Sequence, residues 1–580
     1  MHDIVIRGGT LIDGTGTPGR KVSIAVDAGV ITVIHNNVGA GREEIDATGL
    51  LVTPGWVDIH SHYDGQATWD QHLTPAPWNG VTTVVMGNCG VGFAPVKTGQ
   101  QEFLIQLMEG VEDIPGSALA EGIQWNWESF PEYLDALDAS NYAIDIGTQV
   151  PHGAVRAYVM GEDGANNTHA TSEEISAMAK IVKEGLLAGA LGFSTSRTML
   201  HRAKNGQVVP GTHANAEEVL GLGRMLGEVG HGVFQMASDY IPEEKEFSWM
   251  KQLSRETGKR VLYSVVQSAG DPDQWRRLLR ESEIDASEGG LLTPQIAPRP
   301  VGLLMGFEST VHPFMFHKNY MPLAALSLEE RRSAIAKPEV RASILDEPFD
   351  YDRFDGVLAM ITHGFEKMFA LGEAPDYEPC PDQSLQARSQ AENHSPQEIA
   401  YDIMAADNAC GLIYLPMLGY VDNNLDATAE LMRHPNSIYG LADGGAHCGV
   451  VSDASIPTFL LTHWARDRSR GDRIPIEELV HNQCCKTAQC YGLEDRGVIA
   501  VGMKADINVI DFQNLHIHAP KMVYDLPAQG KRFVQEITGY HTTICSGQVI
   551  YRQGKPTGNL PGKLIRGPQA APQTNNEKQQ

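Results

Sequence analysis

The 580-residue sequence contains no run of about 18 consecutive apolar residues, so we expect no segment that spans a membrane. Its N-terminus shows no basic stretch followed by an apolar core, so we expect no signal peptide. Only eight cysteines are present, without regular spacing, and the adjacent Cys484 and Cys485 are interpreted as packing residues. The sequence therefore predicts no disulfide framework, which favours a reducing cytoplasm.

Basic residues are also scarce relative to acidic ones. Lys and Arg number 45 against 72 Asp and Glu, which gives a formal net charge of −27. Such a surface repels phosphate backbones, so nucleic acid is not expected as a partner. The acidic residues are spread along the chain rather than gathered in a tail, and we interpret them as a source of solubility. A chain of this length is expected to form two or more folding units.

Both ends of the chain show short β patterns punctuated by glycine turns. These patterns fill residues 1–55, with DIVIRGGTLID as an example, and return in residues 491–565, with GMKADINVIDF. The simplest packing is one small β-sandwich built from both ends. The last residues, 566–580, are polar and rich in Pro and Gln, so we expect a disordered tail.

Between residues 56 and 490, short apolar runs rich in β-branched residues alternate with segments of helical period. One such segment is 171–190, where a Thr precedes an acidic first turn, as is typical of a helix start. Eight strands alternating with helices predict an α/β fold, a (β/α)₈ TIM-like barrel. The predicted strands are 56–62, 82–88, 142–150, 191–196, 232–236, 260–265, 291–296 and 437–443.

Two segments do not fit a plain barrel. The apolar run 411–416 is also a candidate strand, so the count of eight has an alternative. The interval 303–405 is too long for a simple connection and contains both helical and polar stretches. We interpret it as an insertion on the face of the barrel, where it would serve as a lid over the active site.

The first predicted barrel strand ends with two histidines, His60 and His62. Because side chains alternate along a strand, both rings lie on one face. The carboxyl ends of barrel strands carry the active site, and two imidazoles on one face can bind a metal ion. The pair alone is weak evidence, since 21 histidines in 580 residues give about one such pair by chance. A second pair, at 516–518, is interpreted as coincidental.

Three more candidate residues follow predicted strands at the same face. Asp443, in LADGGAH, ends the last strand and would serve as metal ligand and general base; the alternative is a turn-forming or helix-capping Asp. Cys89, in GNCGVG after the second strand, is either a small buried hydrophobe or a thiolate ligand. His447, four residues after Asp443, is a candidate substrate-binding donor or simply a polar loop residue.

Arg197, His201 and Arg202 follow the fourth predicted strand, in FSTSRTMLHR. Donors gathered at a barrel mouth suit an anionic substrate, which an arginine would hold through a bidentate pair with a carboxylate. Solvation at the surface is the alternative. We therefore expect a small-molecule amide substrate that carries a carboxylate, bound by these three residues.

These motifs together resemble the amidohydrolase superfamily, and within it the D-aminoacylases or N-acyl-D-amino-acid deacylases. The resemblance rests on VTPGWVDIHSHYD, GVTTVVMGNCGV, LADGGAH and GMKADINVIDF, and it covers most of the chain. It implies a barrel with a two-part β-sandwich, zinc as cofactor, and hydrolysis of an amide. It also implies metal ligands at His60, His62 and Cys89 and a catalytic acid/base at Asp443.

The sequence departs from the resembled family at the fifth and sixth strands. The relatives carry a histidine at the end of each of these strands, and these histidines hold a second metal ion. Here the strands read GVFQMASD and RVLYSVVQS, with Gln235 and Gln267 as poor substitutes. We therefore expect one zinc ion per chain rather than a two-metal centre.

The predicted function is a metal-dependent hydrolase that cleaves a C–N amide bond, with an N-acyl (D-)amino acid as the best-fitting substrate. A zinc-type ion would lower the pKa of its bound water towards ~7, and Asp443 would pass the proton to the departing nitrogen. The alternatives are a cyclic-amide hydrolase or deaminase on the same scaffold, and a non-catalytic binding protein on a degraded barrel. Assembly into a homo-oligomer stays open.

Overall fold

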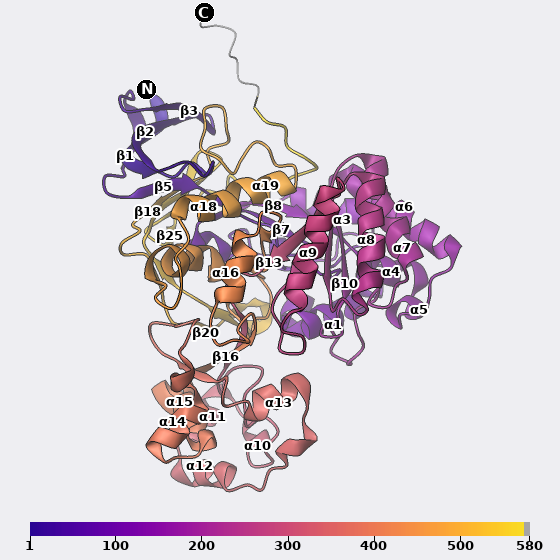
Figure 1. Ribbon diagram of the computed structural model, residues 1–580, viewed down its shortest axis with the longest axis vertical. Helices are drawn as coiled ribbons and strands as arrows, with labels where there is room; N and C mark the ends of the chain where they lie inside the picture. The colour runs from indigo at the N-terminus through magenta and orange to yellow at the C-terminus, as the bar shows by residue number, and fades with distance from the viewer. Residues whose placement is uncertain (573–580) are drawn as a thin grey trace, which may run out of the picture.

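The computed structural model describes residues 1–572, and its centre is a barrel of parallel strands (Figure 1). Three strands pair in the order β6-β7-β8 and six in the order β17-β13-β12-β11-β10-β9. Strands β8 and β9 follow each other with one residue between them and act as one barrel strand, so the predicted barrel of eight strands is confirmed. The strands are β6 (Trp56–Asp58), β7 (Val81–Met86), β8 (Asp145–Thr148), β9 (Val150–Pro151), β10 (Gly192–Arg197), β11 (Val233–Ser238), β12 (Val261–Val265), β13 (Leu292–Ile296) and β17 (Ile438–Tyr439).

The barrel closes just beyond the carboxyl ends of its first and last strands, β6 and β17. The Asp443 N–H donates to the carbonyl of His60 over 3.1 Å, and the His62 N–H donates to the carbonyl of Gly444 over 2.7 Å. These two hydrogen bonds form an isolated parallel bridge between Ser61 and Gly444, past the regular strand ends. The closure therefore runs through the predicted site residues themselves.

Helices pack around the barrel, and their starts follow the capping chemistry of the sequence. Helix α6 (Ser172–Ala188) begins after Thr171, whose hydroxyl accepts the Glu174 N–H while the Glu174 carboxylate accepts the Thr171 N–H. This confirms the helix predicted there. The other helices of the barrel region are α1 (Gln101–Val111), α2 (Gly116–Gly122), α3 (Phe130–Asp138), α4 (His152–Met160), α5 (Glu162–Ala165), α7 (Ala216–Val229), α8 (Glu243–Thr257), α9 (Gln274–Ser287), α16 (Asp426–Arg433), α17 (Ile456–Phe459), α18 (Ile476–Val480) and α19 (Thr487–Cys490).

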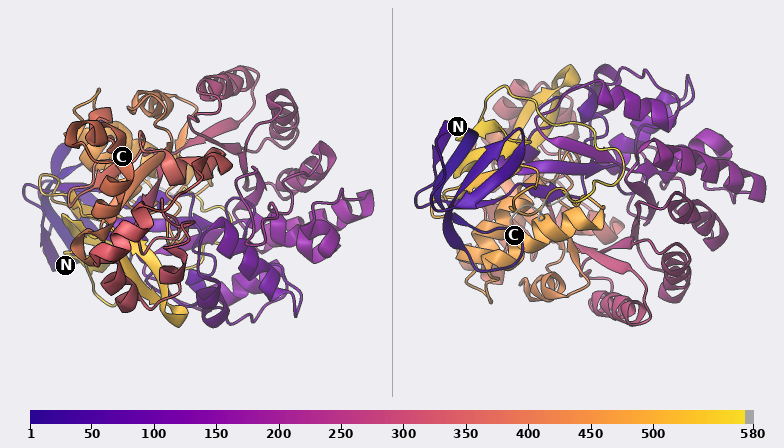
Figure 2. Two further views of the ribbon diagram at one scale, coloured as in Figure 1. Left: turned by 90° about the horizontal axis from the view of Figure 1, so that it is seen from below. Right: turned by 90° about the horizontal axis from the view of Figure 1, so that it is seen from above.

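Strands from both chain ends form one large sheet, in which β5 pairs antiparallel with β18. Seen from above, the indigo N-terminal strands lie beside the yellow C-terminal ones (Figure 2). The predicted β-sandwich from the two chain ends is thereby confirmed. Its strands are β1 (His2–Leu11), β2 (Arg20–Asp27), β3 (Val30–His35), β4 (Gly41–Asp46), β5 (Leu51–Pro54), β18 (Ile507–Ile510), β23 (Tyr540–Cys545), β24 (Gln548–Arg552) and β25 (Lys555–Pro556).

Two short two-stranded sheets interrupt the C-terminal part of this sandwich. One pairs β19 (His516–Ile517) with β22 (Ile537–Thr538), and the other pairs β20 (Lys521–Leu526) with β21 (Gly530–Val534). The Phe533 N–H of β21 donates to the carbonyl of Cys448, over 2.6 Å. The β20–β21 hairpin therefore reaches from the sandwich to the loop that follows the last barrel strand.

The insertion forms a lobe apart from the barrel body, at the bottom of Figure 1. It is flanked by β14 (Val301–Met305) and β16 (Leu412–Leu418), which pair antiparallel, so it extends beyond the predicted 303–405. The apolar run 411–416 lies in β16 and belongs to this lobe rather than to the barrel. The other elements of the lobe are α10 (Met321–Ala324), α11 (Leu328–Ile335), α12 (Pro338–Leu345), α13 (Gly356–His363), β15 (Phe369–Leu371), α14 (Leu385–Glu392) and α15 (Pro396–Ala409).

The predicted disordered tail needs a correction in its first part. The Gly567 N–H donates to the carbonyl of Gly189 over 2.8 Å, and Gln569 exchanges backbone hydrogen bonds with Gly492 and Glu494. Residues 566–572 thus lie along the barrel, because their backbone groups find partners in the turns that end its helices. The remaining residues of the predicted tail, 573–580, lie outside the described part of the chain.

Two further expectations concern membranes and disulfides. Within residues 1–572, no helix is both long and apolar enough to cross a bilayer. All eight cysteines lie in this range and are free thiols, including the neighbours Cys484 and Cys485. Five of the remaining six are at least half-buried, and Cys410 is exposed.

A buried ion network joins the barrel to the sandwich. Asp145 of β8 lies 2.6 Å from an Arg496 guanidinium nitrogen and 2.9 Å from the Lys504 Nζ. Burial opposes ionisation of this carboxyl, but Lys504 and Arg496 outweigh burial and lower the pKa of Asp145 to about 2. A carboxyl whose pKa is lowered in the folded state stabilises the fold at neutral pH, and this stabilisation is lost as the pH falls from about 4 towards 2.

We predict that Asp145→Asn lowers the free energy of unfolding by up to about 3–5 kcal/mol, because two buried cations lose the carboxylate that they share. Urea denaturation at pH 7 measures this loss. Asp135→Asn is the matched control, since Asp135 is 73% exposed in its pair with Arg566, and should change stability little. An Asp145→Asn protein as stable as the wild type would show that the network does not hold the two parts together.

Candidate metal and active site

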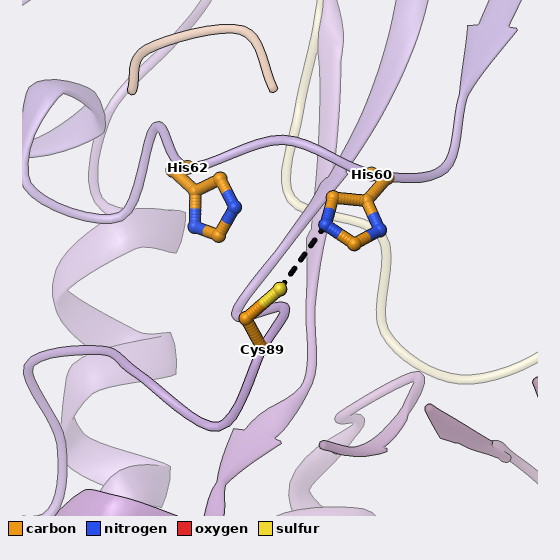
Figure 3. Close-up of side chains that lie close together, drawn as sticks. All are labelled: His60, His62 and Cys89. Carbon is orange, nitrogen blue, oxygen red and sulfur yellow. Dashed lines mark hydrogen bonds between the residues drawn. The ribbon is translucent and has the colours of Figure 1, made fainter. Parts of the chain in front are cut away.

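His60, His62 and Cys89 form a compact cluster at the carboxyl end of the barrel. One ligand atom from each, two imidazole nitrogens and the Cys89 Sγ, lies within 4.8 Å of the other two. The two rings come from one stretch of backbone just past β6, and Cys89 approaches from the turn after β7 (Figure 3). The His60 Nε2 lies 3.3 Å from the Cys89 Sγ, and all three side chains are buried. The cluster has the nitrogen and sulfur donors that zinc prefers.

Asp443 adds a carboxylate to this cluster. Its Oδ1 lies 3.3 Å from the His60 Nε2 and 3.6 Å from the His62 Nε2. Two ligands that each lie about 2.0–2.3 Å from a shared tetrahedral ion are separated by roughly 3.3–3.7 Å. The 3.3 Å contacts of His60 with Asp443 and Cys89, and the 3.6 Å contact of His62 with Asp443, therefore suit ligands of a single zinc ion.

Two of these residues adopt backbone conformations that residues other than glycine rarely use. Cys89 has a φ of 55° and Asp443 a φ of 46°, and His447 nearby has a φ of 53°. Each such conformation costs on the order of 1–3 kcal/mol and persists where surrounding structure imposes it, often at functional sites. The chain thus accepts strain at the turns that aim the Cys89 and Asp443 side chains.

Both histidines have an oxygen acceptor near Nδ1, on the side away from Asp443. The His60 Nδ1 lies 2.9 Å from the Oε1 of Gln295 on β13. The His62 Nδ1 lies 3.3 Å from the Oε1 of Glu112, a close charged contact rather than an aligned hydrogen bond. An imidazole that carries its proton on Nδ1 keeps the lone pair of Nε2 free for a metal. Both rings are therefore oriented as ligands.

Burial and neighbouring charges set the protonation of the four donors. Burial lowers the pKa of His60 to about 4 and raises the pKa of Cys89 to about 11. Burial also disfavours charge on His62, but Glu112, Asp443 and Cys89 raise its pKa well above the usual value. For Asp443 burial is outweighed by His60 and His62, which hold its pKa below the usual range. At neutral pH Asp443 is thus ionised, while His62 and Cys89 carry protons that a metal would displace.

The two glutamines that replace histidines hold loops in place. The Gln235 Oε1 accepts the backbone N–H of Cys89 over 2.9 Å. The Gln267 Nε2 donates to the Asp422 Oδ2 over 2.8 Å. Gln235 therefore supports a residue of the metal cluster through its backbone, and Gln267 is engaged with the segment that precedes α16.

The structure separates the three residues predicted to bind a substrate carboxylate. Arg197 makes two 2.7 Å hydrogen bonds to the Glu246 carboxylate and a third, also 2.7 Å, to the carbonyl of Ala214. The two guanidinium N–H groups that could hold a substrate carboxylate are therefore already bound to Glu246. Arg202 is exposed and donates to the carbonyl of Gly206. The structure does not bring these two guanidinium groups to the metal cluster.

His201, in contrast, lies close to the cluster. Its pKa is lowered to about 3, first by burial and then by the nearby His447 and His62, so the ring is neutral. Its Nδ1 is 2.9 Å from the Ser196 Oγ, which fixes the ring orientation. His447 also lies at the site, with its Nε2 3.6 Å from the Glu112 Oε2. Of the predicted substrate-binding residues, His201 and His447 are the two near the metal cluster.

A small cavity beside Asp443 contains residues that the sequence did not point to. Its volume is about 20 Å³, room for about one water molecule, and its walls include Asp453, Arg532 and Phe533. Arg532 is committed to the Asp525 carboxylate through two 2.8 Å hydrogen bonds. The Asp453 Oδ2 is buried and has no hydrogen-bond partner among the described residues. No local motif marks these residues, because two come from the β20–β21 hairpin, far along the chain.

The second histidine pair, His516 and His518, lies on and after the short strand β19. The two rings are 4.8 Å apart. Within residues 1–572, no third His, Cys, Asp or Glu completes a metal-sized cluster with them.

Comparison with known proteins defines the class to which this fold and site correspond. The model of the amidohydrolase family matches residues 43–551. The match covers most of the chain, and the protein belongs to the amidohydrolase family.

Individual relatives show which members of the family the chain resembles. A D-aminoacylase from Alcaligenes xylosoxydans xylosoxydans is 25% identical over 567 residues, which cover 97% of each chain. An N-acyl-D-aspartate deacylase from the same organism is 30% identical over 279 residues, 47% of this chain and 51% of the relative. The similarity to the D-aminoacylase therefore extends through the barrel, the insertion and both parts of the sandwich.

Solved structures share the fold. A crystal structure of D-aminoacylase has a TM-score of 0.64 at 21% identity and covers 98% of this chain and 100% of its own. An N-acyl-D-glutamate deacylase from Bordetella bronchiseptica, complexed with zinc and a phosphonate inhibitor, has a TM-score of 0.63 at 22% identity with the same coverage. These likenesses establish the fold, a barrel with a sandwich built from both termini.

The protonation of the cluster predicts that zinc affinity rises with pH. His62 and Cys89 must lose their protons to bind the ion, so each proton displaced contributes up to about a tenfold change in affinity per pH unit. Chelator competition between pH 6 and 8 measures the slope. Cys89→Ser should weaken binding and make the slope shallower, and a pH-independent affinity in the wild type would contradict the assigned ligand set.

Proposed function

We propose that the protein is a zinc-dependent hydrolase that removes the acyl group from an N-acyl amino acid. The observation that carries the proposal is the cluster of two imidazole nitrogens and a thiol at the barrel mouth, with the Asp443 carboxylate 3.3 Å and 3.6 Å from the two imidazoles. The similarity to enzymes named as D-aminoacylase, N-acyl-D-aspartate deacylase and N-acyl-D-glutamate deacylase supports this substrate class.

In this proposal the zinc ion is held by His60, His62, Cys89 and Asp443. When bound, it would polarise the scissile carbonyl and acidify a water molecule. One ion is proposed, because Gln235 and Gln267 stand where a second ion would need histidines and both amides are engaged elsewhere.

Asp443 is the proposed general acid/base. Its carboxylate is ionised at neutral pH, so one of its oxygens accepts a proton from the attacking water and returns it to the departing amide nitrogen. The hydrogen bond from its backbone N–H to His60 fixes its position relative to the ligands. The neutral ring of His201 and the half-buried His447 are the proposed donors to the substrate.

The substrate carboxylate is proposed to bind without Arg197 and Arg202, whose guanidinium groups are used elsewhere. The space beside Asp443 is bounded by the β20–β21 hairpin, and Phe533 of that hairpin also lines a cavity of about 340 Å³ with Met522 and Leu412. We propose that the substrate lies along this wall. Eight free thiols are typical of a reducing compartment, which supports a cytoplasmic location.

A substrate panel with zinc-loaded protein tests the proposal. The panel contains N-acetyl derivatives of amino acids in both configurations, together with cyclic amides. Release of free amino acid that requires zinc is the expected result. Turnover of cyclic amides alone would reassign the protein to ring opening, and fewer than about 0.2 zinc ions per chain with no turnover would favour a binding protein on a degraded barrel.

We predict that Asp443→Asn lowers kcat by about 10²–10⁴-fold, the usual contribution of a general acid/base. Steady-state kinetics at saturating zinc and measurement of bound zinc separate this effect from loss of the metal. Asp426→Asn, at an exposed helix position, is the control and should leave kcat unchanged. An Asp443→Asn protein that retains both zinc and wild-type kcat would refute the assignment.

A further inference from the structure

Glu112 is a buried carboxylate at the metal cluster that has no part in the proposed reaction. It directly follows α1 and is 1% exposed. We propose that Glu112 is a positioning residue that orients His62 for zinc and ties this ligand to the loop that carries Asp443. The inference rests on the proposed function, because it presumes that zinc binds at His60 and His62.

The first contact is with the ligand itself. The Glu112 Oε1 lies 3.3 Å from the His62 Nδ1, while the His62 Nε2 faces the Asp443 Oδ1 at 3.6 Å. A carboxylate near Nδ1 favours the proton on that nitrogen and leaves Nε2 as the donor atom. It also makes the imidazole more basic and hence a stronger ligand. Glu112 is thus placed to select which nitrogen of His62 meets the ion.

The second set of contacts is with the loop after the last barrel strand. The Glu112 Oε2 lies 3.6 Å from the His447 Nε2, and the Glu112 carbonyl accepts the His447 N–H. Next to it, the Asp113 Oδ2 accepts the Gly449 N–H over 2.8 Å. The end of α1 therefore fixes the loop four to six residues after Asp443. The Glu112 carboxylate therefore contacts His62 of the metal cluster on one side and His447, in the loop that follows Asp443, on the other.

Burial of Glu112 argues for a role beyond holding the fold. A carboxylate removed from water is costly unless a cation or several donors compensate it. The basic side chains that contact Glu112 in the described structure are two imidazoles, His62 and His447, rather than an Arg or Lys. An imidazole N–H becomes a stronger donor when its other nitrogen binds a metal. A zinc-bound His62 would therefore be a stronger donor to Glu112 than a neutral, metal-free ring.

Zinc affinity of Glu112→Gln in the full chain tests the inference. Glutamine keeps the shape and can still accept a hydrogen bond, but it lacks the charge. We expect the zinc Kd, measured by chelator competition, to rise about 10–100-fold. Changes of this size are typical when a residue that contacts a metal-binding histidine is replaced. Glu109→Gln is the matched control, because Glu109 lies on the same helix and pairs with Lys204 at the surface. Its Kd should stay within about twofold of the wild type.

Two further measurements separate the effect of the Glu112 charge on zinc binding from a loss of fold. Thermal unfolding of the metal-free proteins shows whether Glu112→Gln loses affinity merely through loss of fold, and Glu112→Asp, which retains the charge, should recover part of the affinity. A Glu112→Gln protein that binds zinc as tightly as the wild type overturns the inference. An equal loss in Glu112→Asp and Glu112→Gln also overturns it. A wild type that binds no zinc instead refutes the proposed function.

Discussion

The pair of backbone hydrogen bonds that closes the barrel is the constraint on which the site depends. The Asp443 N–H donates to the His60 carbonyl, and the His62 N–H donates to the Gly444 carbonyl. The residues that join the first strand to the last are thus the proposed ligands and the proposed acid/base. Closure of the barrel therefore brings Asp443 to the cluster of His60, His62 and Cys89, which follows the first two strands.

Side chains around this seam give the cluster its chemistry. Gln295 and Glu112 each place an oxygen near the Nδ1 of one histidine, so that both Nε2 atoms face Asp443. Gln235 accepts the backbone N–H of Cys89 and so holds the strained turn at that residue. Gln235 therefore supports the metal cluster through the backbone of Cys89.

The sequence was sufficient to predict the barrel, the shared sandwich and the grouping of four candidate donors. The alternation of apolar runs and helical segments indicates the barrel, and the rule that active sites lie at the carboxyl ends of its strands groups His60, His62, Cys89 and Asp443. Contacts between distant segments were not predictable in this way. Arg197 looks free in the sequence because its partner, Glu246, lies 49 residues away in helix α8. The run 411–416 has the pattern of a barrel strand, and only its antiparallel partner β14 assigns it to the insertion.

We propose that one zinc ion binds between the ends of the first and last barrel strands. A crystal structure of the zinc-loaded protein, with diffraction recorded on both sides of the zinc absorption edge, would show the ion. We expect one anomalous peak per chain, about 2.0–2.3 Å from His60, His62, Cys89 and Asp443. A second peak beside Gln235 and Gln267, or no peak at the histidine pair, would contradict it.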